Sequence, residues 1–212
     1  APNAFKEADG ALTTHAYGES VFLQNDLLIT GSVGSRLDLS VRVDFLVCKE
    51  ICIPGSVSLQ HSIPVVERSS GPTDETQSLF ARWNARVPVA PAELGLSVDE
   101  LYSQDAIRPG DEFKAAIALV CDAEEGGASA CQGLRPYQGQ LEDRFIPDDI
   151  PSIDLEVTGS RRHPFADGIL ITLSGEASED DPAEEERLHG VARVENSRGE
   201  VLLVNIDLPL PR

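Results

Sequence analysis

The sequence predicts an all-β protein with two β-sandwich domains joined by a short helix and a linker. Two observations support this fold class. In residues 36–47, polar and apolar side chains alternate from Arg36 to Phe45, and residues 104–212 contain several short segments rich in β-forming residues with turn residues between them. A single short stretch, residues 73–87, shows a helical pattern, which Pro88 ends.

The first domain is expected to span residues 1–70. Residues 21–33 are rich in β-forming residues and predict a strand, and residues 36–47 and 56–66 predict two more by their alternation. The cysteine-containing segment between the last two is therefore the connection of an antiparallel hairpin, with Pro54–Gly55 as its turn. The apolar face of the alternating strand comprises Leu37, Leu39, Val41, Val43 and Phe45.

Residues 71–103 are expected to form the helix and the linker. Thr73 is the predicted N-cap, and Asp74 and Glu75 follow it in the first turn, where the helix dipole favours acidic side chains.

The second sandwich domain is expected to span residues 104–212. Its predicted strands cover residues 113–121, 152–160, 168–176, 189–197 and 200–210.

The number of strands sets an expectation for the first domain. An immunoglobulin-like sandwich needs about seven strands, whereas residues 1–68 supply only about three or four by pattern. We therefore expect two immunoglobulin-like domains, of which the first lacks its N-terminal strands.

The charge of the chain disfavours several classes of partner. The formal net charge is −19, which repels phosphate backbones and anionic lipid. We therefore expect neither a nucleic-acid partner nor a role at a membrane surface. No apolar run approaches the roughly 20 residues that span a bilayer.

The four cysteines form two local pairs, Cys48/Cys52 and Cys121/Cys131. Such pairs fit an oxidising compartment, where disulfides persist. A zinc site would need four ligands, and the wide spacing of the second pair makes it a poor zinc knuckle, so we expect no metal. Because Cys121 and Cys131 flank an acidic loop that contains glycines, we expect them to form a structural disulfide.

The residues alone leave three interpretations of Cys48/Cys52: a metal clip, a structural cross-link and a redox site. The loop that this pair closes is very small, so a bridge would stabilise the fold little through chain entropy, which favours a chemical role. A redox site needs a reachable thiolate and a second cysteine close enough to resolve a mixed disulfide. Lys49 favours a thiolate and Glu50 opposes it, so the sequence does not fix the direction of the pKa shift.

Two segments carry a resemblance to a known family. Residues 43–59 (VDFLVCKEICIPGSVSL) resemble the reactive hairpin in the N-terminal periplasmic domain of DsbD-type thiol:disulfide interchange proteins. Residues 14–23 (THAYGESVFL) resemble the cap-loop segment of that family, and the two segments lie in the expected order. The likeness covers about residues 8–66 and is closest to the ScsB-like branch, which is linked to copper tolerance.

The resemblance implies an immunoglobulin-like redox domain in the periplasm that needs no cofactor. In the family, this domain receives electrons from a thioredoxin-like donor domain, which a membrane-embedded domain of the parent chain supplies. It passes them to oxidised periplasmic thioredoxin-fold proteins, as a protein-disulfide reductase. By this likeness Cys52 is the attacking thiol, and Cys48 completes the disulfide.

The family's cap loop corresponds to Thr14, His15, Ala16, Tyr17 and Gly18. Ala16 stands where the best-known members carry a shielding Phe, so we expect Tyr17 or His15 to shield the sulfurs instead. His15 is also a candidate to exchange a proton with a thiol.

Two other functions stay open. One is a secreted two-domain binding or scaffold module whose disulfides are only structural. The other is a copper-binding module that uses the thiolates of Cys48 and Cys52. The lack of Met, whose thioether is a preferred copper(I) ligand, counts against the copper-binding module.

Overall fold

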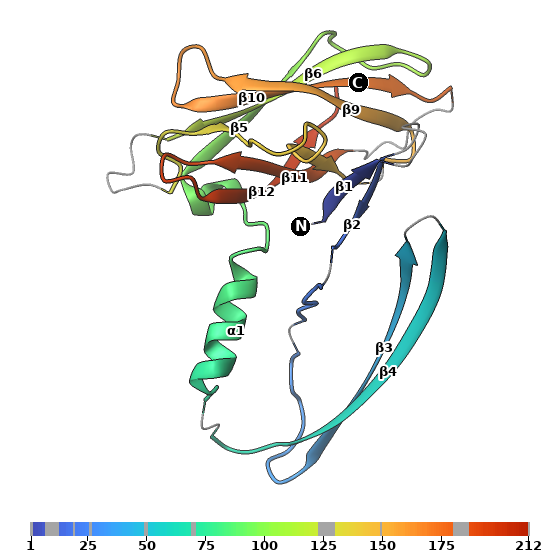
Figure 1. The fold of residues 1–212 in the computed structure, drawn as a ribbon, viewed down its shortest axis with the longest axis vertical. Helices are drawn as coiled ribbons and strands as arrows, with labels where there is room; N and C mark the ends of the chain where they lie inside the picture. Colours follow the sequence, from blue (N-terminus) through green and yellow to red (C-terminus); the bar gives the residue numbers. More distant parts are fainter. Residues whose placement is uncertain are drawn as a thin grey trace. The chain divides into compact units, whose positions relative to one another are not determined.

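The computed structural model confirms the all-β fold class. It describes residues 2–6, 13–18, 20–25, 27–48, 51–68, 71–122, 130–148, 150–179 and 187–211. In this part of the chain, antiparallel strands dominate and one α-helix occurs (Figure 1). The chain divides into two compact units, a larger one comprising Ala1–Val21 with Ala81–Arg212 and a smaller one comprising Phe22–Phe80.

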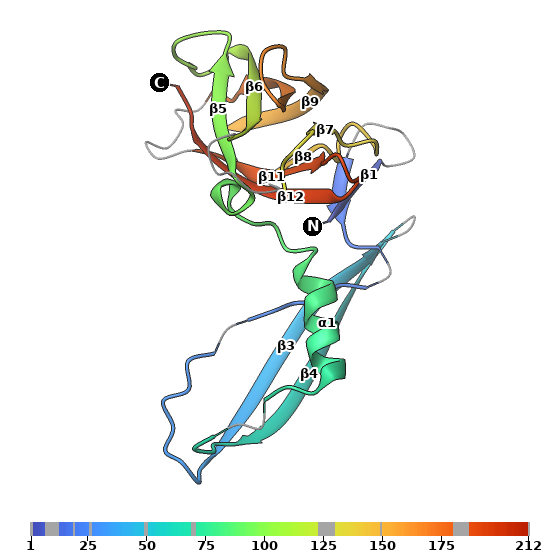
Figure 2. The same ribbon diagram turned by 90° about the vertical axis from the view of Figure 1, so that its left-hand side faces the viewer.

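The larger unit contains two sheets that share one hydrophobic core. One sheet has the order β5 (Leu96–Tyr102), β6 (Glu112–Cys121), β10 (Gly168–Ala177) and β9 (Ile153–Arg162). The other has the order β12 (Val201–Pro209), β11 (Arg187–Glu195) and β7 (Arg135–Pro136), with β8 (Phe145–Pro147) also paired to β11. Figure 2 shows these sheets as two layers.

The core of the larger unit lies between these layers. Ile117 and Ile171 from the first sheet and Phe145 and Val204 from the second are fully buried in one cluster. The alternation of apolar residues along each strand places them on the inner faces, as in a β-sandwich. The coarse sandwich prediction for this region agrees with the structure, whereas the immunoglobulin-like topology stays a prediction.

The larger unit also contains a small sheet of only two strands. β1 (Asn3–Lys6) pairs antiparallel with β2 (Thr13–Ala16). A short 3-10 helix, η1 (Pro91–Leu94), precedes β5. Side-chain alternation does not predict β1, β2, β7 or β8, because each is at most four residues long and shows no clear period.

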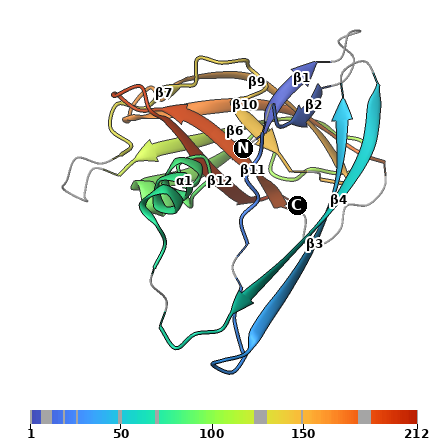
Figure 3. The same cartoon turned by 60° about the horizontal axis from the view of Figure 1, so that its bottom comes forward.

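The smaller unit is built around one long hairpin. β3 (Arg36–Cys48) pairs antiparallel with β4 (Cys52–Pro64) along their whole length (Figure 1, Figure 3). No residue of either strand is buried. The hairpin therefore has no hydrophobic core of its own among the described residues, in contrast to the larger unit.

The helix begins where the sequence predicts. α1 spans Asp74–Asn84, and the Thr73 Oγ1 accepts a hydrogen bond of 3.2 Å from the Thr76 backbone N–H. This is the N-cap arrangement expected from Thr73.

Within the part of the chain that the structure describes, no helix combines the length and the hydropathy that crossing a membrane requires.

Three sequence predictions differ from the structure. The described residues of the predicted strand 21–33 form no strand, because no neighbouring strand supplies backbone hydrogen bonds. Pro54–Gly55 is not the turn: both residues lie inside β4, which starts at Cys52. β5 pairs with β6, so the sheet of the larger unit begins before the predicted boundary at residue 104.

The buried core gives a test of the fold. We predict that Ile171→Ala lowers the free energy of unfolding by about 2–5 kcal/mol, because it leaves a cavity between the two sheets. Val201→Ala, at an exposed position of β12, is the matched control and should change it by about 0.5 kcal/mol or less. Urea unfolding followed by circular dichroism measures both. Equal effects of the two substitutions would contradict the assignment of the core.

Candidate functional site

The β3–β4 hairpin places Cys48 and Cys52 directly opposite each other at its closed end. They form the last pair of an unbroken antiparallel register that begins with Arg36 opposite Pro64. The two Cα atoms lie 4.1 Å apart and the sulfurs form a disulfide with an S–S distance of 2.05 Å. Strand pairing therefore brings the two cysteines together. Lys49 and Glu50, which were expected to influence the thiolate, lie outside the described residues.

The register decides on which face of the hairpin the disulfide lies. Successive side chains of a strand point to opposite faces, and directly paired residues share a face. Cys48 and Cys52 therefore share the face of Asp44 and Ser56, not that of Phe45. This face is polar along most of its length, where Arg42 forms an exposed ion pair with Asp44 at 3.0 Å.

The disulfide is exposed, and its nearest described chain neighbours are apolar, with Leu46 on its own face and Val47 and Ile53 on the opposite face of the hairpin. Cys48 and Cys52 are both exposed. Leu46 on the same face is 66% exposed. Val47, Ile51 and Ile53 are 61%, 73% and 60% exposed. Exposed apolar groups around a reactive group are typical of a surface that binds another protein. We call Leu46, Val47, Ile51 and Ile53 the apolar collar.

Gly55 and Pro54 fit the strand for different physical reasons. A Cβ at Gly55 would lie 2.6 Å from a ring carbon of Phe45, its partner across the ladder, so any larger residue would displace that ring. Pro54 has no N–H to donate, and a hairpin of two edge strands tolerates it where that N–H would point outward. These two residues shape the strand beside the disulfide rather than its turn.

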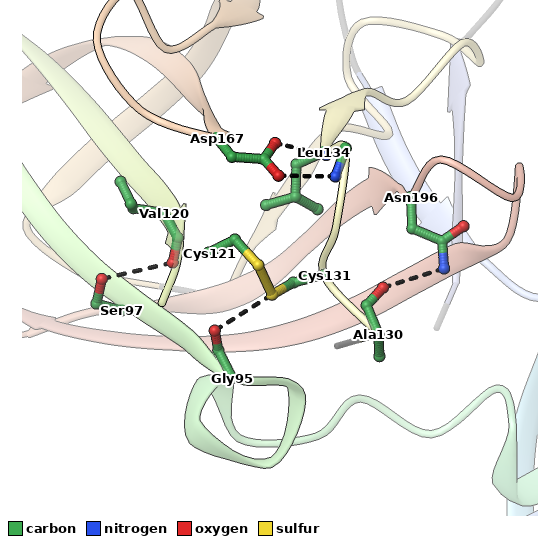
Figure 4. Close-up of a disulfide and its surroundings, with 10 residues drawn as sticks. Gly95, Ser97, Val120, Cys121, Ala130, Cys131, Leu134, Asp167 and Asn196 are labelled. Atoms are coloured by element: carbon green, nitrogen blue, oxygen red, sulfur yellow. Dashed lines mark hydrogen bonds between the residues drawn. A yellow bond between two sulfur atoms is a disulfide. The ribbon is translucent and has the colours of Figure 1, made fainter. Parts of the chain in front are cut away.

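The second disulfide has a different environment. Cys121 ends β6 and bonds to Cys131, with an S–S distance of 2.01 Å and a Cα–Cα distance of 5.6 Å. Cys131 is fully buried, and its Sγ lies 3.3 Å from the carbonyl oxygen of Gly95, as Figure 4 shows. A disulfide sulfur has no proton to donate, so this is a close polar contact.

Hydrogen bonds fix the chain on both sides of Cys131. The Asp167 carboxylate accepts hydrogen bonds from the backbone N–H groups of Gly133, at 2.8 Å, and Leu134, at 3.2 Å (Figure 4). The Asn196 side-chain amide donates to the Ala130 carbonyl at 3.1 Å. This bridge therefore connects a strand end to a segment that is already held in place, which is what a structural disulfide does.

The residues of the predicted cap loop belong to the larger unit. Thr14, His15 and Ala16 lie in β2, and Tyr17 and Gly18 follow it. Tyr17 is exposed, and His15 is half-buried beside Asp143 and Arg193 of the same unit. The disulfide belongs to the smaller unit, so its cover by these five residues stays a prediction.

Sequence reasoning missed a buried ion pair close to His15. Arg193 of β11 and Asp143 are both almost fully buried, with an N–O distance of 3.2 Å. The Arg193 guanidinium also donates to the Pro2 carbonyl oxygen and lies 5.9 Å from the centre of the Tyr137 ring. The only signal in the sequence was a charged residue within the apolar segment 188–194.

Comparisons with known proteins add no identification. Matching the chain to protein-family models, to curated proteins and to solved structures finds no similar protein. Among the residues that the structure describes, no group of three or more His, Cys, Asp or Glu is placed to hold a metal ion. The site is therefore interpreted from its geometry and from the resemblance of residues 43–59.

The environment of His15 predicts a pH dependence. Burial lowers the pKa of His15 below its usual 6.5, Arg193 also lowers it, and Asp143 partly opposes them. Its Nε2 is buried without a hydrogen-bond partner in the described structure. Because the folded state prefers the neutral imidazole, this contribution to stability is present above pH 6.5 and is lost as the pH falls below it.

The matched variant is His15→Gln, which removes the titrating group. We predict that the wild-type chain loses more of its free energy of unfolding than this variant does when the pH drops from 7.5 to 5.5. Urea unfolding at the two pH values measures the difference. Parallel losses in both proteins would show that His15 does not contribute.

Proposed function

We propose that the Cys48–Cys52 disulfide is a thiol:disulfide exchange site and that the chain acts as a protein-disulfide reductase. The observation that carries this proposal is the contrast between the two bridges. Cys48–Cys52 is exposed within an apolar collar, whereas Cys131 is fully buried behind a hydrogen-bonded segment. Exposed disulfides are the labile and catalytic ones, whereas buried ones resist reduction.

The proposed reaction is a two-electron exchange. The thiolate of reduced Cys52 attacks one sulfur of a substrate disulfide, and the other substrate sulfur leaves as a thiolate. The Cys48 thiolate then attacks the mixed disulfide at the Cys52 sulfur. The substrate leaves fully reduced, and the Cys48–Cys52 disulfide forms again. A donor dithiol regenerates the reduced pair by the same two steps in reverse and becomes oxidised itself.

The hairpin geometry supports the resolving step. Cys48 and Cys52 are paired across the ladder with their Cα atoms 4.1 Å apart, so the second thiolate is already next to the mixed disulfide. Strand pairing holds this separation with no contribution from a hydrophobic core. The assignment of Cys52 as the attacking thiol rests on the family resemblance.

The resemblance also supplies the proposed partners. The donor is a thioredoxin-like domain, and the substrates are oxidised thioredoxin-fold proteins of the periplasm. A membrane-embedded domain of the parent chain would supply the donor with electrons. The apolar collar supports docking of such proteins, because thiol exchange between proteins needs both sulfurs to meet in line on an accessible surface.

Single cysteine variants test the assignment of roles. We predict that Cys48→Ser, once reduced, accumulates a mixed disulfide with an oxidised thioredoxin-fold protein, because the chain's own resolving thiol is absent and only the reverse attack by the substrate's freed thiolate remains. Cys52→Ser should accumulate at least about tenfold less, because it lacks the attacking thiol. Non-reducing gel electrophoresis and mass spectrometry measure the adduct. Equal adducts in the two variants would contradict these roles, and no adduct in either would contradict the proposed exchange.

Substitution within the collar tests protein docking separately from sulfur reactivity. We predict that Ile51→Asp slows exchange with a thioredoxin-like protein by about fivefold or more, the effect of losing a contact worth about 1 kcal/mol. Reduction by dithiothreitol should keep its rate, because a small dithiol needs no docking surface. Phe165→Asp, at an exposed position of the larger unit, is the matched control. Equal slowing with both reductants would contradict docking at the collar.

A further inference from the structure

The closed end of the β9–β10 hairpin collects positive charge in a chain whose formal net charge is −19. β9 pairs antiparallel with β10, with Arg162 opposite Ile169 and Arg161 opposite Leu170 (Figure 1). The loop of residues 163–167 joins the two strands and carries Phe165, which is 93% exposed. We call Arg161, Arg162, His163 and Phe165 the basic tip.

Neither arginine of the basic tip has a carboxylate partner. Arg161 and Arg162 are both exposed, and neither forms an ion pair or a side-chain hydrogen bond within the described part of the chain. Elsewhere in this part, ion pairs with carboxylates engage Arg42, Arg135, Arg187, Arg193 and Arg198. The chain has 36 acidic residues against 17 basic ones. Two adjacent arginines that its own carboxylates leave unpaired are therefore open to a carboxylate from outside.

Arg144 adds a third positive charge beside one side of the basic tip. Its guanidinium donates a hydrogen bond of 3.0 Å to the Ser160 hydroxyl oxygen. Ser160 and Arg162 are two residues apart in β9, so their side chains leave the same face of the strand about 7 Å apart. The Nε of Arg144 is buried without a hydrogen-bond partner in the described structure. A carboxylate bound at Arg162 would therefore also be attracted by Arg144.

Hydrogen bonds hold the loop of the basic tip at several points. The His163 backbone N–H donates to the Gly168 carbonyl oxygen at 2.8 Å, and the Phe165 backbone N–H donates to His163 Nδ1 at 3.3 Å. The rings of His163 and Phe165 meet edge to face with their centres 6.4 Å apart. At the end of the loop, the Asp167 carbonyl oxygen accepts a hydrogen bond of 2.8 Å from the Cys121 N–H. Phe165 is thus exposed on a fixed backbone, which lowers the entropy that binding costs.

The side chains of the basic tip indicate the chemistry of its partner. The planar guanidinium of arginine matches a carboxylate with two parallel hydrogen bonds. Arginine and aromatic side chains are enriched in protein–protein interfaces. A nucleic acid or an anionic membrane would also meet the acidic remainder of the surface. A short acidic segment can contact the tip alone, because charges more than about 8 Å away are largely screened at physiological ionic strength.

We propose that the basic tip binds an acidic segment of another protein, with carboxylates of that segment against Arg161 and Arg162 and an apolar side chain against Phe165. The acidic remainder of the chain repels such a segment over most of its surface and so directs it to the tip. The basic tip belongs to the larger unit and the Cys48–Cys52 disulfide to the smaller one. Disulfide exchange does not use the tip, so either proposal can fail while the other holds.

Fluorescence anisotropy with a labelled nonapeptide tests the proposal. The acidic probe has a central Leu between Asp and Glu residues, and a neutral counterpart carries Asn and Gln in their place. We expect the acidic peptide to bind the chain with a dissociation constant of about 100 µM or below. The neutral peptide should bind at least about tenfold more weakly, because it forms no charge-assisted hydrogen bonds with the arginines.

Variants of the chain locate the binding site. Arg161→Gln combined with Arg162→Gln should weaken binding of the acidic peptide at least about tenfold, because two charge-assisted contacts are lost. Phe165→Asp should also weaken it, while the rate of exchange with a thioredoxin-like protein stays unchanged. Arg108→Gln combined with Arg198→Gln, at exposed positions, makes the same change in net charge and is the matched control, with an expected effect of about twofold or less.

Four outcomes overturn the proposal. The first is equal binding of the acidic and the neutral peptide, and the second is no binding of the acidic peptide at about 1 mM. The third is equal weakening by the two double-arginine variants, which would show that only the net charge of the chain acts. The fourth is tighter binding to vesicles that contain phosphatidylserine than to the acidic peptide, which would assign the basic tip to a membrane surface.

Discussion

The unbroken register of the β3–β4 ladder is the constraint on which the candidate site depends. It brings Cys48 and Cys52 to the same pair at the closed end and decides which side chains share their face. A shift by one residue would separate the cysteines and exchange the apolar and polar faces. The hairpin has no buried residues. The register of β3 with β4 is therefore held by backbone pairing, by the alternation of side chains and by the disulfide itself.

The two disulfides differ in their environment, and the proposed difference in their roles rests on that contrast. The bond between Cys121 and Cys131 joins a strand end to a segment that Asp167 and Asn196 already fix, and its removal would disturb a packed core. The bond between Cys48 and Cys52 closes a loop too small to stabilise the chain much by entropy. It lies on a surface where another protein can reach both sulfurs.

The two units differ in what they do with their apolar side chains. The larger unit buries its apolar side chains between two sheets and contributes nearly all of the hydrophobic core. The smaller unit leaves its apolar side chains on one face and in the collar around the disulfide. Apolar surface that is not used for folding remains available for binding another protein, as the proposed exchange requires.

Alternation predicted the long strands well, because a period of two is visible over ten or more residues. It also placed the cysteines at the end of a hairpin. Composition overestimated residues 21–33, because β-forming residues without a partner strand give no strand. Residue type alone assigned the turn to Pro54–Gly55, although both residues lie inside β4 and the Phe45 ring packs against Gly55. The pairing of Asp143 with Arg193 depends on a tertiary contact that no local pattern encodes.

The central claim is that exposure of both cysteines makes Cys48–Cys52 the reducible bridge, and that the burial of Cys131 makes Cys121–Cys131 the resistant one. The most direct test equilibrates the chain in a series of glutathione and dithiothreitol buffers, alkylates the free thiols and assigns them by mass spectrometry. The account predicts that Cys48 and Cys52 become half reduced between about −180 and −270 mV, the range of redox-active protein pairs, while Cys121 and Cys131 stay oxidised to below about −300 mV. Reduction of both pairs at the same potential, or of Cys121–Cys131 first, would contradict it.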